Sequence, residues 1–447
     1  MKAVIIGNGT SGKSANKLMK KLGYQTFVVD DKKTRLTQKL CEKLLFGLDI
    51  LVLSPGVSSE HVLVREAKEK NIEVVSEFEV GARLISSKVI AITGTNGKTT
   101  TVSLTGELLQ KEGRHVYVGG NIGTAVSSFC AQVLPEDITV LEASSFQLEN
   151  ILHFHPHIAV FLNISPDHLN RHKTMQNYIN AKMRIFEKQT EKDFAVLNLD
   201  DKPLMEQDFT SLRSEIYYFS TKKECKGCYV KRGCIYFSDG VTSVFVMRVK
   251  DIPLAGDHNI SNVLASLLAC ILAGEKIKDL PPKVKAFKGV SHRLEYVCEV
   301  NGVTFINDSK ATNVSSTMVA LRAMNEPTTL ILGGSDKGFD FDQLFGDLPP
   351  IVKNVVAIGE TASKILHSAN KFNISNVFYA KSFKEGVRLA FDLASFGEVV
   401  LLSPACASFD MFKNFEERGK VFIKIVRELE KSENRKIRNK KGKKIQA

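Results

Sequence analysis

The chain has 447 residues, 43% of them hydrophobic and 25% charged, and a formal net charge of +12. This length predicts about three domains, and the composition is ordinary for a soluble globular protein. The N-terminal apolar run is too short for a signal peptide, and the longest apolar stretch, residues 263–273, is too short to span a membrane. We therefore expect a cytoplasmic protein with no membrane contact.

The eight cysteines are scattered along the chain, which is typical of reduced thiols in a cytosolic enzyme rather than of a disulfide scaffold. One cluster joins Cys225, Cys228 and Cys234, and its CxxC pair either supplies half of a zinc site or lies in an exposed hairpin. At the C-terminus, residues 431–447 hold eight Lys or Arg and one Glu. We predict a basic disordered tail there, either simply solvated or in contact with nucleic acid or acidic lipid.

Residues 1–88 alternate strand and helix signals, with strands AVIIG, TFVVDD, ILVLSPG and IEVVSE and a helix over 11–22. Such alternation predicts a parallel, Rossmann-like α/β domain. The turn at residues 7–12 matches G-x-G-x-x-G, and Asp30 is the acid expected about 20 residues on. Alone this pattern favours NAD, but a UDP group would use the same turn and helix N-terminus.

Residues 89–290 continue the alternation with strands VIAIT, ITVLEA, IAVFLNI and FAVLNL, then a β-rich patch at 216–252 and an apolar helix at 259–273. This predicts a central ATPase-like domain with a parallel sheet. Residues 291–430 carry VTFIND, TTLILGG, NVVAIG, NVFYA and EVVLLSP, each followed by a helical stretch. They predict a third, Rossmann-like α/β domain, and no repeat of fixed period is present.

The segment GTNGKTT at residues 94–100 follows strand VIAIT and precedes a helical stretch. It comprises Gly94, Thr95, Asn96, Gly97, Lys98, Thr99 and Thr100. Backbone N–H groups of such a loop and the helix N-terminus bind phosphate oxygens. Lys98 would reach the β- and γ-phosphates and the Thr99 hydroxyl would bind Mg²⁺. The spacing is a variant of the Walker loop in the correct strand–loop–helix setting, so we predict an ATP site.

Three further side chains accompany this loop. Glu142 ends strand ITVLE and His168 follows strand IAVFLNI, so both fall at the carboxyl edge of the sheet. We interpret Glu142 as a Mg²⁺ ligand and His168 as a functional residue. Lys182 shares one helix face with Tyr178 and Phe186, where it either pairs with a carboxylate or acts in the site.

Two polar segments end strands of the third domain, NDSKATN at 307–313 and SPACASF at 403–409. Both lie where α/β sheets place their ligands. Cys406 could be a nucleophile, but no positioned base is identifiable, so a buried structural cysteine is favoured.

Together these motifs resemble the Mur ligase family, and within it the branch that adds D-glutamate. The resemblance covers residues 1–428 and rests on GTNGKTT, GGNIG (119–123), LEASSFQLE (141–149), DHLNRH (167–172), NAKMRIFE (180–187), SHRLE (291–295), NDSKATN, LGGSDKG (332–338) and SPACASFDMFKNFEERG (403–419). No DNPR motif of the diaminopimelate- or lysine-adding branch is present.

The resemblance implies an ATP-dependent ligase of cytoplasmic peptidoglycan precursor synthesis, which adds D-glutamate to UDP-N-acetylmuramoyl-L-alanine through an acyl phosphate. It implies that residues 1–88 bind the UDP-sugar, 89–290 bind ATP and 291–430 bind the amino acid. A monomer with small-molecule substrates and no nucleic-acid partner is expected.

The resemblance also implies residue roles. Lys98 would be catalytic together with His168 and Lys182, and Lys182 would be carbamylated. A pair of magnesium ions would bind Thr99, Glu142, His168 and the Lys182 carbamate. Further nucleotide contacts would come from Asn259, Asn262, Arg293 and Asp308. UDP-sugar contacts would come from Gly9, Thr10, Ser11, Asp30, Ser54, Pro55, Gly56, Asn121 and Ser144. D-glutamate contacts would come from Thr312, Lys337, Ser408 and Phe415.

Other functions compete with this interpretation. Another Mur branch or a folylpolyglutamate synthase would share the ATP loop, but the motifs of the third domain argue against both. An NAD-dependent oxidoreductase would leave GTNGKTT, Glu142 and Lys182 without a purpose. A nucleic-acid-binding ATPase would depend on the basic tail, so removal of residues 431–447 separates it from a ligase.

Overall fold

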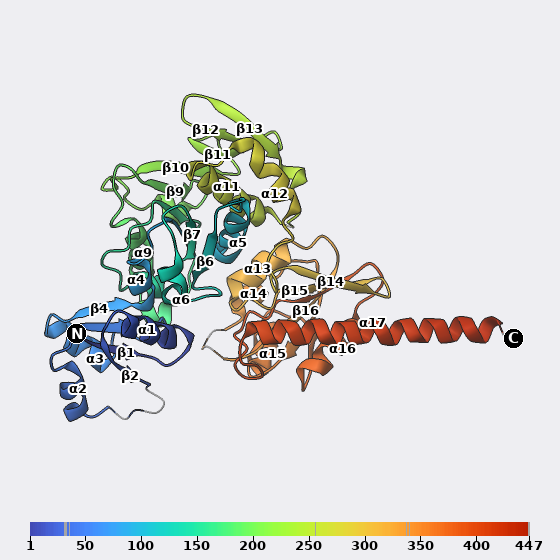
Figure 1. Cartoon of the computed structure of the whole chain (residues 1–447). Coiled ribbons are helices and arrows are strands. Elements are labelled where there is room, and N and C mark those ends of the chain that lie inside the picture. Colours follow the sequence, from blue (N-terminus) through green and yellow to red (C-terminus); the bar gives the residue numbers. More distant parts are fainter. Residues whose placement is uncertain (31–33, 35, 255, 337, 339, 446–447) are drawn as a thin grey trace. The chain divides into compact units, whose positions relative to one another are not determined.

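The protein was analysed as a computed structural model, which describes residues 1–445 except 31–33, 35, 255, 337 and 339. The fold is α/β, as predicted, and its strands form three sheets (Figure 1). The chain divides into two compact units, Met1–Pro253 with Ile260–Phe287, and Leu254–Asn259 with Lys288–Ala447. The first unit holds two of the sheets and the second unit holds the third.

The N-terminal sheet is parallel, with strand order β2-β1-β3-β4. Its strands are β1 (Lys2–Ile6), β2 (Gln25–Val29), β3 (Ile50–Leu53) and β4 (Glu73–Ser76), and its helices are α1 (Thr10–Lys21), α2 (Gln38–Leu45), α3 (Val62–Glu69) and α4 (Glu77–Ala82). Alternate residues of β1 pack in the hydrophobic cores on opposite faces of the sheet. Val4 and Ile6 pack with residues of α2 and α3, whereas Ala3 and Ile5 pack with residues of α1.

The central sheet has the strand order β13-β12-β11-β10-β9-β8-β5-β7-β6. Its strands are β5 (Lys88–Thr93), β6 (Val116–Gly120), β7 (Ile138–Glu142), β8 (Ile158–Phe161), β9 (Phe194–Asn198), β10 (Glu215–Ser220), β11 (Gly227–Lys231), β12 (Cys234–Ser238) and β13 (Ser243–Arg248). Pairing is parallel from β6 to β11 and antiparallel beyond it. Because β5 lies between β7 and β8, the carboxyl ends of these three strands meet at one place.

The helices of this segment are α5 (Lys98–Leu108), α6 (Val126–Phe129), α7 (Ser145–Leu148), α8 (Leu169–His172), α9 (Met175–Met183), α10 (Lys202–Met205), α11 (Asp257–Leu272) and α12 (Leu280–Ala286). Short 3₁₀ turns occupy Cys130–Gln132, Arg184–Phe186, Val249–Asp251 and Ile277–Asp279. One core fills the side of the sheet that α6, α7 and α9 cover, with Phe161, Phe186 and Leu197 among its fully buried members.

The C-terminal sheet has the order β14-β15-β19-β16-β17-β18 and is parallel except for the β14–β15 pair. Its strands are β14 (Glu295–Val300), β15 (Val303–Asn307), β16 (Thr328–Gly333), β17 (Val352–Ile358), β18 (Val377–Tyr379) and β19 (Val399–Leu402). Its helices are α13 (Val314–Arg322), α14 (Asp342–Gly346), α15 (Ala362–Lys371), α16 (Phe383–Leu393) and α17 (Phe415–Ile445). Separate cores lie on its two faces.

Two features differ from the sequence expectations. β6 and β14 were not anticipated. The predicted disordered tail is helical as far as Ile445, because α17 continues through it. The tail contains one glycine and no proline among Lys, Arg and Glu residues, which are good helix formers, and extending a helix that has already nucleated costs little. No helix among the described residues is long and apolar enough to cross a membrane.

Candidate active site

The loop after β5 is built on glycines that no other residue replaces easily. Gly94 has φ +148° and Gly97, which precedes α5, has φ +84°. A Cβ at Gly97 would lie 2.4 Å from Asn262 Oδ1, so α11 packs directly on the loop. Both positions favour glycine for conformation, and Gly97 also favours it for space.

Two side chains hold the loop in shape. Lys98 Nζ donates to the carbonyl oxygens of Gly94 (2.8 Å) and Thr95 (2.7 Å), so its ammonium lies over the loop. Asn163, after β8, accepts from the Asn96 N–H (2.8 Å) and donates to the Asn96 carbonyl (3.0 Å). Asn163 was not predicted from the sequence, although an amide directly after a buried strand at the carboxyl edge is a recognisable signal.

Glu142 lies at the end of β7 and is almost fully buried. Its Oε2 accepts from Thr99 Oγ1 and its Oε1 accepts from Asn121 Nδ2, both at 2.8 Å. The structure therefore joins a predicted metal ligand, a loop hydroxyl and a predicted sugar contact. Carboxylate and hydroxyl oxygens are the donors that Mg²⁺ prefers, so this pair fits a magnesium ion.

Lys182 lies on α9 with its side chain buried. Its Nζ donates to the Gly94 carbonyl (2.7 Å) and to Thr93 Oγ1 (3.4 Å), and lies 4.8 Å from the centre of the Tyr178 ring. These hydrogen bonds run to the strand and loop of the predicted ATP site rather than to a carboxylate. Burial, and then the positive charge of Lys98, hold the pKa of Lys182 well below its usual value.

His168 directly precedes α8 and has a left-handed backbone, φ +54°. Its Nε2 lies 3.5 Å from Asp167 Oδ2, and its ring packs edge-on against Phe146 at 4.7 Å between centroids. The side chain is 42% exposed. It is therefore accessible to a ligand.

A second network, which the sequence analysis did not identify, surrounds Arg171. Its guanidinium pairs with Glu149 at 2.6 Å, stacks on Phe146 at 4.3 Å, and donates to the Pro55 carbonyl at 3.1 Å. His172 contacts the same carboxylate at 3.2 Å. The DHLNRH segment thus holds the Ser54–Gly56 segment, in which UDP-sugar contacts were predicted.

Some of the predicted UDP-sugar residues lie beside the N-terminal sheet and others beside the central sheet. Gly9, Thr10 and Ser11 lie at the start of α1, and Asp30 follows β2. The turn between β1 and α1 is tight, because a Cβ at Gly12 would lie 1.9 Å from the Gly7 carbonyl oxygen. Ser144 caps α7, where its hydroxyl and N–H both bond Gln147.

Asn259, Arg293 and Asp308 belong to the second unit, whereas Asn262 lies in the first, where Thr101 Oγ1 donates to its Oδ1 at 3.3 Å. The predicted nucleotide contacts are therefore divided between the units. Asp308 is buried and accepts from Ser403 Oγ at 2.7 Å. Burial raises the pKa of this carboxyl to about 7.

Among the predicted D-glutamate residues, Ser408 is buried, and its Oγ has no hydrogen-bond partner within the described part of the chain. Phe415 begins α17, with Lys310 Nζ 5.3 Å from its ring centre. Thr312 follows the NDSKA stretch after β15 and is half-buried. Lys337 lies outside the described residues.

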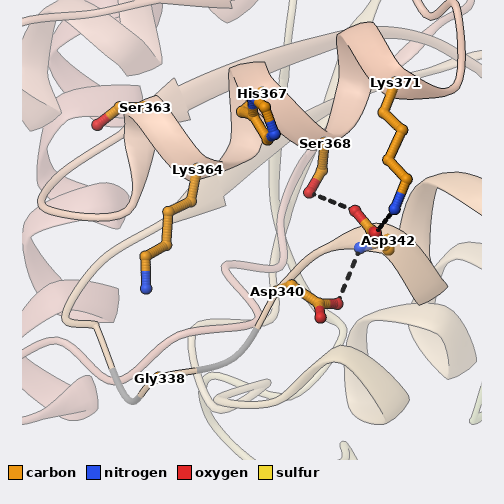
Figure 2. A pocket seen from close by; sticks show the side chains of 8 residues that line it. All are labelled: Gly338, Asp340, Asp342, Ser363, Lys364, His367, Ser368 and Lys371. Atoms are coloured by element: carbon orange, nitrogen blue, oxygen red, sulfur yellow. Dashed lines mark hydrogen bonds and ion pairs between the residues drawn. The ribbon is translucent and has the colours of Figure 1, made fainter.

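A surface cavity of about 520 Å³ lies between α15 and the segment before α14. Figure 2 shows Ser368 and Lys371 both reaching Asp342, whose N–H donates to Asp340. Lys364 pairs instead with Asp336 at 2.6 Å. None of the predicted site residues that the structure describes lines this cavity, and most of the charges printed along it are already paired.

Among the described residues, no group of three His, Cys, Asp or Glu side chains could hold a metal ion. The CxxC segment lies at the start of the β11–β12 hairpin, with Cys228 buried and Cys225 and Cys234 half-buried. The hairpin of the two sequence alternatives is thus present, but it is less exposed than expected.

Comparison with known proteins identifies the group to which this geometry belongs. Residues 92–270 match the Mur ligase middle domain, and residues 292–406 match the Mur ligase glutamate ligase domain. The chain belongs to the Mur ligase family.

Two relatives of this family are named UDP-N-acetylmuramoylalanine–D-glutamate ligase. The one from Caldanaerobacter subterraneus subsp. tengcongensis is 41% identical over 95% of this chain and 98% of its own. The one from a Thermoanaerobacter species is 40% identical over 96% of this chain and 98% of its own. Such coverage extends the similarity to all three sheets.

Solved Mur ligase structures share the fold at low identity. UDP-N-acetylmuramate-alanine ligase MurC from Thermotoga maritima has a TM-score of 0.60 and 15% identity, covering 96% of this chain and 99% of its own. MurF ligase from Thermotoga maritima, in complex with ADP, has a TM-score of 0.60 and 16% identity, covering 97% of this chain and 95% of its own.

Proposed function

We propose that this chain is an ATP-dependent ligase that joins D-glutamate to UDP-N-acetylmuramoyl-L-alanine. The observation that carries the proposal is the cluster around the β5–α5 loop, in which Thr99 and Asn121 hold both oxygens of Glu142. The cluster joins the glycine loop after β5 to a buried acid at the point where three strand ends meet. The full-length relatives named for this reaction support the choice of acceptor.

In this proposal the loop from Gly94 to Thr100 binds the phosphates of ATP. Its N–H groups and the N-terminus of α5 supply positive partial charge, and Lys98 adds a full charge. Thr99 and Glu142 would hold Mg²⁺, with His168 and modified Lys182 serving a second ion. Bound Mg²⁺ supplies neutralisation of phosphate charge and alignment of the reacting oxygens.

The chemistry has two steps. The alanyl carboxylate of the UDP-sugar attacks the γ-phosphorus of ATP, the bond to the bridging oxygen breaks, and ADP leaves. The neutral amine of D-glutamate then attacks the acyl carbon, the acyl C–O bond breaks, and phosphate leaves with a proton lost from nitrogen. Lys98 reduces the repulsion between carboxylate and phosphate in the first step.

The protonation state of Lys182 decides whether this side chain can become a metal ligand. A protonated amine repels a cation, whereas a neutral amine reacts with CO₂ to give a carbamate, an anionic oxygen ligand. Burial and the neighbouring Lys98 lower the pKa of Lys182, which favours the neutral amine that carbamylation needs. We propose that Lys182 is carbamylated.

The UDP-sugar and D-glutamate are assigned to different parts of the chain. The UDP-sugar would bind at the start of α1, at Asp30, at residues 54–56 and at Asn121 and Ser144. D-glutamate would bind Thr312, Lys337, Ser408 and Phe415, where the unpartnered buried hydroxyl of Ser408 suits a carboxylate. We further propose that the enzyme works as a monomer in the cytoplasm.

The test is phosphate release by purified protein supplied with ATP, Mg²⁺ and UDP-N-acetylmuramoyl-L-alanine, followed by single amino acids. Release should require the UDP-sugar and D-glutamate together, and L-glutamate should serve as the matched control without release. Release with another amino acid, and none above background with D-glutamate, would reject the proposed acceptor.

A further inference from the structure

The second unit contains a fully buried arginine to which neither the sequence motifs nor the proposed chemistry assign a role. Arg418 lies on α17, one turn after Phe415, and is the largest fully buried side chain in the described chain. An arginine is almost never buried unless its donors are satisfied. Its partners therefore indicate what the buried position is for.

The partners of Arg418 come from two strand-end loops. Nε donates to Ser309 Oγ (3.0 Å), and Nη2 donates to the Ser309 carbonyl (2.8 Å), both in the loop after β15. In the loop after β19, Nη2 donates to the Cys406 carbonyl (2.9 Å) and Nη1 to the Ala407 carbonyl (3.2 Å). One planar guanidinium thus fixes the backbone of both loops.

The same cluster extends to two further segments. Ser309 Oγ donates to the Phe415 carbonyl at 2.8 Å, which fixes the start of α17. The Ala407 carbonyl also accepts from the Ser335 N–H at 2.9 Å, in the loop after β16. At Gly334 in that loop, a Cβ would lie 3.1 Å from Arg418 Nη1 and 2.2 Å from the Ala407 carbonyl oxygen. Four chain segments therefore meet around one side chain.

These segments are the ones that carry the residues assigned to D-glutamate. Thr312 follows Ser309 by three positions, Ser408 follows Ala407, and Phe415 bonds Ser309 directly. The backbone at Ala405 is left-handed, φ +57°, a strained conformation for a residue with a side chain. Arg418 bonds the carbonyls of the two residues that follow Ala405 and precede Ser408.

We propose that Arg418 is a positioning residue for D-glutamate, fixing the loops after β15, β16 and β19 and the start of α17 so that their side chains converge on the amino acid. It does not touch the substrate. The inference rests on the proposed function, because it concerns the amino-acid site of that same reaction. Substitution of Arg418 should therefore impair the second step, in which the amine attacks, and leave the first step unchanged.

Geometry, rather than charge, is the property that the site requires. Burial lowers the pKa of Arg418 to about 10, so the side chain remains charged at neutral pH. A lysine would keep the charge, but its single ammonium cannot reproduce a planar fork that bonds two loops. Arg418→Lys therefore separates the two properties, and Ser309→Ala removes one arm of the cluster with less risk to folding.

The control is Arg427→Lys, on the same helix. Arg427 is exposed, pairs with Glu430 at 3.0 Å and donates to the Val297 carbonyl at 2.8 Å, away from the strand-end loops. All variants are assayed with saturating ATP and UDP-sugar for the KM of D-glutamate. The first step is measured separately, without D-glutamate, by the positional isotope exchange in ATP that reversible acyl-phosphate formation causes.

Arg418→Lys and Ser309→Ala should raise the KM of D-glutamate about tenfold to a hundredfold, because small displacements of binding groups have effects of that size. The isotope exchange and the KM of ATP should stay near those of the unmodified enzyme, as should every parameter of Arg427→Lys. An unchanged KM of D-glutamate in both variants, or an equal loss in both steps, would overturn the inference. Absence of D-glutamate-dependent release from the unmodified enzyme would instead reject the proposed function, and the inference with it.

Discussion

The surroundings of Lys182 determine whether its amine is charged or neutral, and so whether it can be carbamylated. Its ammonium would lie near Lys98 and under the ring of Tyr178, with the Gly94 carbonyl as its nearest acceptor. Burial and the positive charge of Lys98 favour the neutral amine, and they outweigh the opposite effect of the Asp167 and Glu142 carboxylates. The pKa is lowered in the direction that carbamylation requires, and the modified side chain would extend toward the loop that we propose binds ATP.

We therefore expect Lys182→Ala to reduce ligation about a hundredfold or more, the range seen when a preorganised charge is removed. A short-chain carboxylic acid should partly restore activity, because its carboxylate can occupy the space left by the carbamate. Phosphate release measures both effects. Lys182→Arg is the matched control, since it fills the space and cannot be rescued. Full activity of Lys182→Ala would reject the carbamate.

Some residues of the candidate site could be predicted from the sequence, whereas Arg418 could not. The loop glycines and Glu142 could be proposed from the sequence because they lie directly after or at the end of a buried strand, where ligands gather in α/β sheets. Arg418 could not be found in this way, because a charged residue in a helix with period-3.6 polarity is normally solvated. Only the folded chain shows that its guanidinium meets backbone carbonyls from distant loops.

At the scale of elements, the junction between β1 and α1 depends on close backbone packing. Gly12 lies in the first turn of α1, where an added Cβ would lie 1.9 Å from the Gly7 carbonyl oxygen. Gly9 has φ −75° and open space around it. Lack of space therefore requires glycine at position 12. At position 9, neither space nor backbone conformation requires it.

We expect Gly12→Ala to lower the free energy of unfolding by about 1–3 kcal/mol, the usual cost of overpacking, and to raise the KM of the UDP-sugar. Gly9→Ala should leave unfolding within about 0.5 kcal/mol of the unmodified protein, as surface changes usually do. Thermal and denaturant unfolding of the two variants would test the difference. Equal stability would mean that α1 can move away from the turn at no cost.

The elements themselves were mostly predictable. Short β-branched runs bounded by glycine and acids identified strands in all three sheets, because strands buried on both faces are nearly continuous in apolar residues. Strand order was not predictable, since the placement of β5 between β7 and β8 depends on long-range packing. The helical tail was missed because polarity was given more weight than helix propensity.

For the molecule as a whole, positive charge is concentrated at one end of the chain. Residues 434–447 hold seven Lys or Arg and no acid, which leaves a net charge of +5 on the rest. Before them, Glu433 Oε2 accepts from Asn301 Nδ2 at 3.0 Å, in the turn between β14 and β15. A chain that ends at Glu433 therefore keeps the anchor of α17 and loses the charge.

We expect this shortened chain to ligate D-glutamate at a rate within about twofold of the full chain, because single surface changes away from a site have small effects. Its retention on an immobilised polyanion should weaken, and the dependence of that retention on salt should become shallower, since fewer counterions are released. Paired assays of phosphate release and salt elution test both statements. Loss of ligation with retained folding would instead give the tail a role in the reaction.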